Sequence, residues 1–220
     1  LMDLALNAIE LMDRNLYERT CDVRWWATDS AVVDALADPS PERAAHASRR
    51  LGVILGAYTV YLDIWLCDRD GRVAASGRPD RFPVVGHSVR QEPWFAKSMA
   101  LATADVARAP LLQDAEVATY ATAVRAGGAT HGAPLGVLAI HFDWAPQARA
   151  IVQGVRLSEE DAKRSRVMLV DARRRVIASS DGRGVLSETV SFDTGGRKAG
   201  FTHDANGTTT AFHLTPGYET

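Results

Sequence analysis

The sequence predicts an α+β protein in which a long N-terminal helix precedes two related modules, each an antiparallel sheet with flanking helices. Segment 66–76, LCDRDGRVAAS, returns at 169–179 as LVDARRRVIAS, with six of the eleven positions identical. Each copy consists of two apolar runs separated by a polar turn, which is typical of a β-hairpin. Helical spacing fills the first quarter of the chain before any strand pattern begins. These observations predict a helical stalk followed by two modules of one kind.

The helical part is predicted to cover residues 1–57. Apolar residues recur at mostly helical spacing through residue 27, with charged residues between them. Segment 38–41, Asp-Pro-Ser-Pro, interrupts this pattern. Ser40 is suited to cap a second helix that begins at Pro41 and ends near Gly56.

Residues 58–155 are predicted to form the first module. A polar loop and a short helix beginning at Pro93 follow its hairpin, and a connecting helix covers 145–155. Five antiparallel strands are expected, at 60–68, 72–77, 104–110, 117–126 and 134–144.

Residues 156–220 are predicted to form a second, shorter module, which we expect to be truncated. Ser158 begins a helix with acidic residues in its first turn. The repeated hairpin at 166–180 follows, and then strands at 198–204 and 208–214. The loop, the short helix and a cluster of Arg with aromatic residues follow the hairpin in the first module alone. We therefore expect one binding site there, and a role as a spacer or a relay for the second module.

Composition argues against several functions. The net charge of −2, with 46% apolar and 24% charged residues, lacks the basic surplus typical of nucleic-acid-binding proteins. No run of about 18 apolar residues is present, so no segment of this chain is predicted to span a membrane. Common catalytic motifs and metal-ligand spacings are absent, so we predict no enzyme, cofactor or metal site. His141 is expected to be a structural histidine in a strand, and Cys21 and Cys67 form either one disulfide or two free thiols.

Four segments carry a resemblance to a known family. They are 68–73 (DRDGRV), 89–95 (VRQEPWF), 134–140 (PLGVLAI) and 170–179 (VDARRRVIAS). In this order, after a long helix, they resemble the double Cache sensor domain of bacterial methyl-accepting chemotaxis proteins, which contains two PAS-like modules in tandem. The resemblance spans nearly the whole chain.

The resemblance implies the periplasmic ligand-binding domain of an inner-membrane chemoreceptor. In such a receptor the first, membrane-distal module binds a small molecule, the N-terminal helix pairs with its mate in a homodimer, and membrane-spanning helices lie beyond both ends. The alternatives are the sensor domain of a histidine kinase or diguanylate cyclase, or a structural or enzymatic domain on the same fold.

Arg90 and the aromatic pair Trp94 and Phe95 are the first candidate ligand-binding residues. Amino-acid sensors of this family carry an Arg followed closely by an aromatic pair, and a guanidinium holds a carboxylate with two parallel hydrogen bonds. Here the spacing is two residues longer and the second aromatic residue is Phe rather than Tyr. The expected ligand is a small carboxylate, an amino acid or an amine, and this departure disfavours an α-amino acid among the three. The alternative is that Arg90 pairs with a surface acid such as Glu92 and that both rings belong to the core.

Five further residues complete the candidate site: Asp63, Trp65, Asp105, Thr119 and Tyr120. Tyr61, Asp63 and Trp65 are expected to alternate on one face of the first strand. Asp105 begins a strand after the helix and is the favoured counter-charge for a ligand ammonium group, while Thr119 and Tyr120 lie in the strand predicted to form the opposite wall. A buried carboxylate at Asp63 needs a partner, whereas an edge position in solvent would remove that need.

Overall fold

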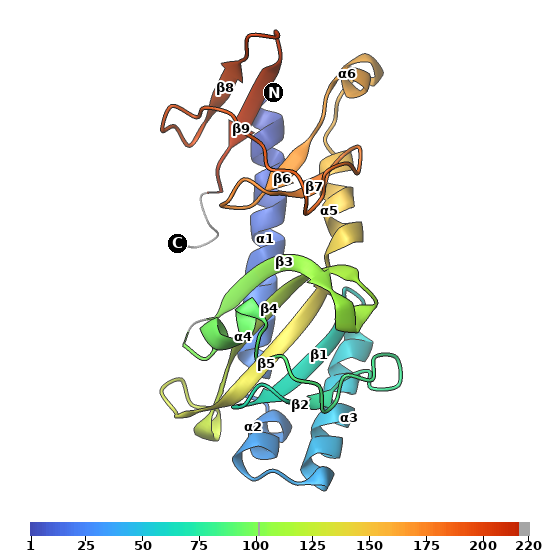
Figure 1. Cartoon of the computed structure of the whole chain (residues 1–220), viewed down its shortest axis with the longest axis vertical. Coiled ribbons are helices and arrows are strands. Elements are labelled where there is room, and N and C mark those ends of the chain that lie inside the picture. The colour runs from blue at the N-terminus through green and yellow to red at the C-terminus, as the bar shows by residue number, and fades with distance from the viewer. Residues whose placement is uncertain (101, 216–220) are drawn as a thin grey trace. The chain divides into compact units, whose positions relative to one another are not determined.

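The structure is a computed structural model that describes residues 1–100 and 102–215 (Figure 1). The chain divides into two compact units, which we call the sheet unit (Arg19–Trp144) and the hairpin unit (Leu1–Glu18 with Ala145–Thr220). Helix α1 (Met2–Trp26) contributes residues to both units. Residues 216–220 of the predicted second module lie outside the described residues.

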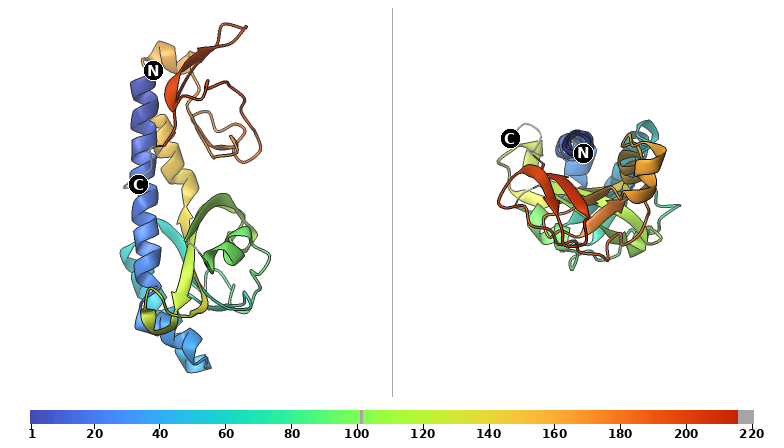
Figure 2. Two further views of the ribbon diagram at one scale, coloured as in Figure 1. Left: turned by 90° about the vertical axis from the view of Figure 1, so that its left-hand side faces the viewer. Right: turned by 90° about the horizontal axis from the view of Figure 1, so that it is seen from above.

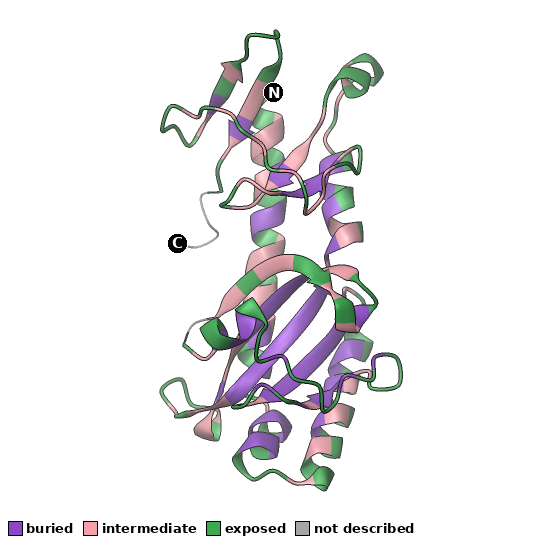
Figure 3. Cartoon of the chain, viewed as in Figure 1, coloured by how far each residue is buried: buried purple, intermediate pink, exposed green. Residues whose placement is uncertain are grey.

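The sheet unit is built on one five-stranded antiparallel sheet with strand order β2-β1-β5-β4-β3. The strands are β1 (Tyr61–Asp68), β2 (Val73–Ser76), β3 (Thr103–Ala109), β4 (Ala115–Arg125) and β5 (Pro134–Asp143). The central strands β1, β4 and β5 are largely buried (Figure 3). Because successive side chains of a strand point to opposite faces, both faces of the sheet contribute to a core. The predicted five antiparallel strands are confirmed.

Helices cover one face of this sheet, as the left view of Figure 2 shows. They are the end of α1, α2 (Ser30–Ala37) and α3 (Pro41–Ala57). The Ser40 side chain caps α3 by accepting a hydrogen bond from the Arg43 backbone N–H at 3.2 Å, as the sequence predicts. Helix α2 was not predicted as a separate element; the Asp29 side chain caps it, and its apolar residues from Ala31 to Leu36 are buried.

The other face carries α4 (Pro93–Ser98) and the preceding loop. Phe82, Val89, Trp94 and Phe95 from these segments pack on the sheet around Trp65. The sheet therefore has a helix-packed face and a face covered by a loop and one short helix.

A β-bulge in β1 changes which residues share a face. Register shifts between Tyr61, which lies opposite Phe142, and Asp63, which lies opposite His141. Tyr61 consequently contacts Trp26 and Phe142 on the helix-packed face, whereas Trp65 belongs to the loop-covered face. The prediction that Tyr61 shares a face with Trp65 is wrong for this reason.

The hairpin unit contains short elements. They are α5 (Trp144–Gln153), α6 (Glu159–Arg164), β6 (Met168–Val170), β7 (Val176–Ser179), β8 (Ala199–His203) and β9 (Thr209–His213). β6 pairs with β7, and β8 pairs with β9, each in an antiparallel pair. None of the helices within the described residues is long and apolar enough to cross a membrane. Cys21 and Cys67 are free thiols, which settles the disulfide alternative.

The sequence repeat is also a structural repeat. Asp68 Oδ1 accepts from the backbone N–H groups of the hairpin turn at 2.9 Å, and Asp171 Oδ1 does the same at 2.8 and 3.0 Å. The loop after each hairpin returns to it, because Val73 N–H donates to a carbonyl oxygen at residue 87 and Val176 N–H to one at residue 188. The second module thus keeps more of the first than the sequence predicts.

Charge is reversed at one position of the repeat, which is fully buried in the first module and half-buried in the second. Asp63 and Arg166 stand at equivalent places and contact equivalent serines: Ser76 Oγ donates to Asp63 at 2.7 Å, and Arg166 Nε donates to Ser179 Oγ at 3.1 Å. Arg166 also binds both carboxylate oxygens of Glu188 at 2.8 Å. At this position the first module has a hydrogen-bond acceptor, the Asp63 carboxylate, and the second module has a donor, the Arg166 guanidinium.

Candidate functional site

A cavity of about 70 Å³ opens on the loop-covered face of the sheet unit. Its polar lining residues are Glu92, Asp105, Arg108, Thr119 and His141, and the indoles of Trp65 and Trp94 lie among them with short apolar side chains of β3 and β4. This volume exceeds the roughly 10–15 Å³ that one water needs and is far below the ~300–1,000 Å³ of sites for drug-sized ligands. The cavity therefore suits a compact molecule.

Three polar side chains form a row across the sheet beneath the cavity. The strand register places Asp105 of β3 opposite Thr119 of β4, and Thr119 opposite His141 of β5. Directly opposed residues of antiparallel strands project to the same face, so all three side chains point to one side of the sheet. Carboxylate, hydroxyl and imidazole groups are thus brought together from segments far apart in sequence.

His141 is a buried histidine with one unused nitrogen. Its Nδ1 lies 3.0 Å from Thr119 Oγ1, and its Nε2 has no hydrogen-bond partner within the described part of the chain. Burial lowers the pKa of His141 to about 3, so the ring is neutral at physiological pH. A buried polar atom without a partner is costly, and a bound ligand would supply the partner.

The Trp65 indole is held in place from behind by Asp63. Trp65 Nε1 donates to Asp63 Oδ2 at 2.9 Å, and the indole centroid lies 3.9 Å from that of the His141 ring. Asp63 also accepts from Ser76 Oγ and from the backbone N–H groups of Ile64 and Arg78, at 2.7 to 3.0 Å. Burial raises the pKa of the Asp63 carboxyl, while these hydrogen bonds favour its carboxylate form.

Four of the predicted site residues line the cavity: Trp65, Trp94, Asp105 and Thr119. The other four are placed elsewhere. Asp63 lies beneath Trp65, Phe95 packs in the core beside Trp94, and Tyr120 projects to the opposite face of the sheet because it alternates with Thr119.

Arg90 lies outside the cavity because its backbone is held against the first hairpin turn. Val89 N–H donates to the Gly71 carbonyl at 2.7 Å, and a Cβ on Gly71 would come within 2.8 Å of the Arg90 Cα. The Arg90 side chain is 67% exposed and lies 3.9 Å from the Asp70 carboxylate. This arrangement resembles the surface ion pair that the sequence left as an alternative, with Asp70 in place of Glu92.

Sequence reasoning did not select three of the polar lining residues: Glu92, Arg108 and His141. Strand alternation offered a signal for His141, since it projects away from its buried neighbours Ile140 and Phe142. No comparable signal identified Arg108, whose guanidinium binds Glu116 Oε1 at 2.8 Å.

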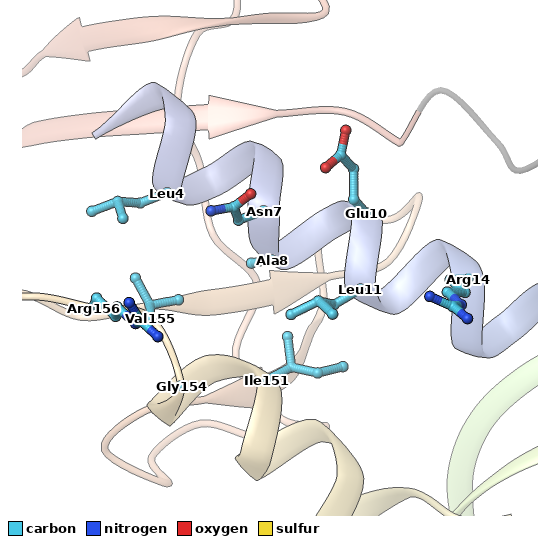
Figure 4. A pocket seen from close by; sticks show the side chains of 10 residues that line it. All are labelled: Leu4, Asn7, Ala8, Glu10, Leu11, Arg14, Ile151, Gly154, Val155 and Arg156. Carbon is cyan, nitrogen blue, oxygen red and sulfur yellow. The ribbon is translucent and has the colours of Figure 1, made fainter.

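A larger hollow of about 520 Å³ lies within the hairpin unit, between α1 and α5 (Figure 4). Leu4, Leu11 and Ile151 border it, together with Glu10 and Arg14. None of these polar side chains is buried. The hollow is an open groove without buried polar groups, so we assign the candidate site to the cavity of the sheet unit.

Sequence comparisons give no match to a family profile or to a curated protein. Solved structures do match. The sensor domain of the V. cholerae histidine kinase DctB aligns with a TM-score of 0.70 at 20% identity, over 88% of this chain and 70% of that one. The ligand-binding domain of the Pseudomonas fluorescens chemoreceptor CtaA, in complex with L-serine, aligns with a TM-score of 0.59 at 17% identity, over 84% and 72%.

The ligand-binding domain of the Pseudomonas aeruginosa amino acid chemoreceptor PctC, in complex with GABA, is also similar. It aligns with a TM-score of 0.65 at 15% identity, over 92% of this chain and 86% of that one. At these identities the likeness establishes the fold. The chain has the α+β, tandem PAS-like fold of the double Cache sensor domains that bacterial chemoreceptors and histidine kinases use.

Proposed function

We propose that this chain is the extracytoplasmic sensor domain of a membrane-anchored chemoreceptor and that it binds a small carboxylate, amino acid or amine in the cavity of the sheet unit. The observation that carries the proposal is the cavity itself. It joins two indoles, a row of polar side chains and a buried His141 nitrogen that has no hydrogen-bond partner in the described part of the chain, on a fold whose solved examples include complexes with L-serine and GABA. Few polar anchors within apolar walls are typical of small-molecule sites.

Signalling would follow from ligand binding to one of two states of the domain. A ligand shifts such an equilibrium only by its difference in affinity for the two states. In this proposal the chain is the periplasmic domain of an inner-membrane receptor. Two copies of the receptor form a homodimer through α1. The role is binding without catalysis.

A histidine-kinase sensor is the second candidate, because the DctB sensor domain aligns with the chain at a TM-score of 0.70. The two candidates share the same binding site and differ in the cytoplasmic output. The sequence of the parent protein beyond Thr220 distinguishes them directly.

A thermal-shift screen of the 220-residue chain tests the proposal. Amino acids, small carboxylates and amines are added singly, and hits are measured by titration calorimetry. A ligand at 100 times its Kd adds ~2.7 kcal/mol to the free energy of unfolding and should raise Tm by several degrees. If no compound of the three classes binds, the chain is not a direct small-molecule sensor of this kind.

A further inference from the structure

The charges that line the cavity favour a cation. Glu92 and Asp105 contribute carboxylates, and among the described lining residues only Arg108 carries a positive charge. That guanidinium is already bound to Glu116 Oε1 at 2.8 Å. A ligand carboxylate would therefore meet two acids and compete with Glu116 for the one cation.

The aromatic walls fit the same ligand. Trp65 and Trp94 both line the cavity, and the hydrogen bond from Trp65 Nε1 to Asp63 fixes one of the two indoles. The face of an indole attracts a cation within about 6 Å of its centroid, and this attraction is largest where water is excluded. Two indoles around a cavity of about 70 Å³ can contact a compact cation from two sides.

His141 adds a hydrogen-bond acceptor. If Nδ1–H donates to Thr119 Oγ1, Nε2 carries a lone pair, and the contact between Nδ1 and Oγ1 is 3.0 Å. An ammonium N–H would satisfy this buried nitrogen, which has no partner among the described residues. Because the ring is neutral, it does not repel a positive charge.

We infer that the cavity selects a compact organic cation, a small primary or secondary amine without a carboxylate, held between Trp65 and Trp94 with Asp105 as its counter-charge and His141 Nε2 as its hydrogen-bond acceptor. The inference rests on the proposed sensor function and narrows its ligand class. It makes Asp105 the residue that decides between an amine and the corresponding amino acid.

The test compares amino acids with the amines that remain when their carboxylate is removed. Serine and ethanolamine, alanine and ethylamine, and lysine and cadaverine are titrated into the chain by calorimetry, with succinate as a dicarboxylate. At least one amine should bind tenfold or more tightly than its amino acid, and raising the salt concentration should weaken that binding.

Variants then assign the binding to this cavity. Asp105→Asn should weaken the amine at least tenfold, and Trp94→Leu should weaken it more than Trp94→Phe. Asp80→Asn, at an exposed acid outside the lining, is the matched control and should bind as the parent chain does. Melting temperatures without ligand establish that each variant is folded.

The results of these titrations distinguish an error in the cation assignment from an error in the sensor function. Tighter binding of an amino acid or succinate than of every amine, or amine binding that Asp105→Asn leaves unchanged, overturns the cation assignment and leaves the sensor function standing. No binding by any compound overturns the sensor function and the cation assignment together.

Discussion

Asp63 stabilises both the core and the cavity wall of the sheet unit. Its side chain is fully buried and accepts four hydrogen bonds, one of which orients Trp65. Asp63→Asn keeps the shape of the side chain but turns an amide NH₂ toward groups that are themselves donors. We expect a loss of roughly 1–3 kcal/mol in the free energy of unfolding, measured by urea denaturation. Asp80→Asn should stay near the parent value, and equal losses in the two variants would refute this account.

His141 makes the stability of the sheet unit depend on pH. Its folded pKa of about 3 lies below the ordinary value of 6.5, so the unfolded chain takes up a proton there before the folded chain does. The stabilising contribution is therefore complete above pH 6.5 and is lost progressively as the pH falls toward 3, by up to ~1.4 kcal/mol per pH unit.

Urea denaturation between pH 4 and 7 measures this slope. His141→Gln should show a flatter pH profile than the parent chain, even if the variant is less stable overall. Asp63 contributes with the opposite sign, because its pKa is raised, but it is present in both proteins and cancels in the comparison. Parallel profiles for parent and variant would exclude His141 as the source.

At the scale of the elements, the pairing of β1 with β5 depends on a glycine. A Cβ on Gly136 would lie 2.2 Å from the Cys67 backbone carbonyl oxygen, and a backbone contact cannot yield as a flexible side chain can. Gly136→Ala should therefore lower Tm markedly in a calorimetric scan.

Gly56 provides the matched control for that substitution. It lies in α3, and a Cβ there would meet nothing within 4 Å. Gly56→Ala should stabilise the protein by roughly 0.5–1 kcal/mol, because Ala loses less backbone freedom in a helix than Gly. A Gly136→Ala variant as stable as Gly56→Ala would mean that β1 and β5 are not as closely packed as described.

Local patterns predicted the elements well, since hairpin turns, the Ser40 cap and strand alternation are encoded by neighbouring residues. They failed where the chain departs from a regular period. The bulge after Tyr61 inserts one residue into β1 and moves Tyr61 to the other face, and no local residue pattern marks it.

The residues that line the cavity were predictable only in part, because several of them are placed by contacts between segments far apart in the sequence. The strand patterns of β3 and β4 are enough to place Asp105 and Thr119 in the sheet. The position of Arg90 depends instead on a long-range contact, the pairing of its loop with the hairpin turn at Gly71. His141 was underrated because its significance lies in its cross-strand neighbour Thr119, which is distant in sequence.

For the whole molecule, the division into two units predicts which segments a bound ligand will protect from hydrogen exchange. A ligand bound in the cavity stabilises only conformations in which β3, β4, β5 and α4 are intact. Hydrogen exchange with saturating ligand should therefore slow most in peptides from 93–143. Peptides from β8 and β9 of the hairpin unit serve as the internal reference. Equal slowing in both sets would show that the two units do not open independently.

The reversed charges at Asp63 and Arg166 bear on how a duplicated chain avoids misfolding. Two similar hairpins in one polypeptide can exchange places while the chain folds, and repeated domains are prone to this error. In an exchanged arrangement Arg166 would direct its N–H donors at the donors that Asp63 normally satisfies, and Asp63 would face the carboxylate of Glu188. The first mismatch would leave a charge unpaired at the fully buried Asp63 site, which is strongly unfavourable, and the second would bring two carboxylates together. Each hairpin thus carries a chemical identity that restricts it to its own module, although the two share most of their sequence.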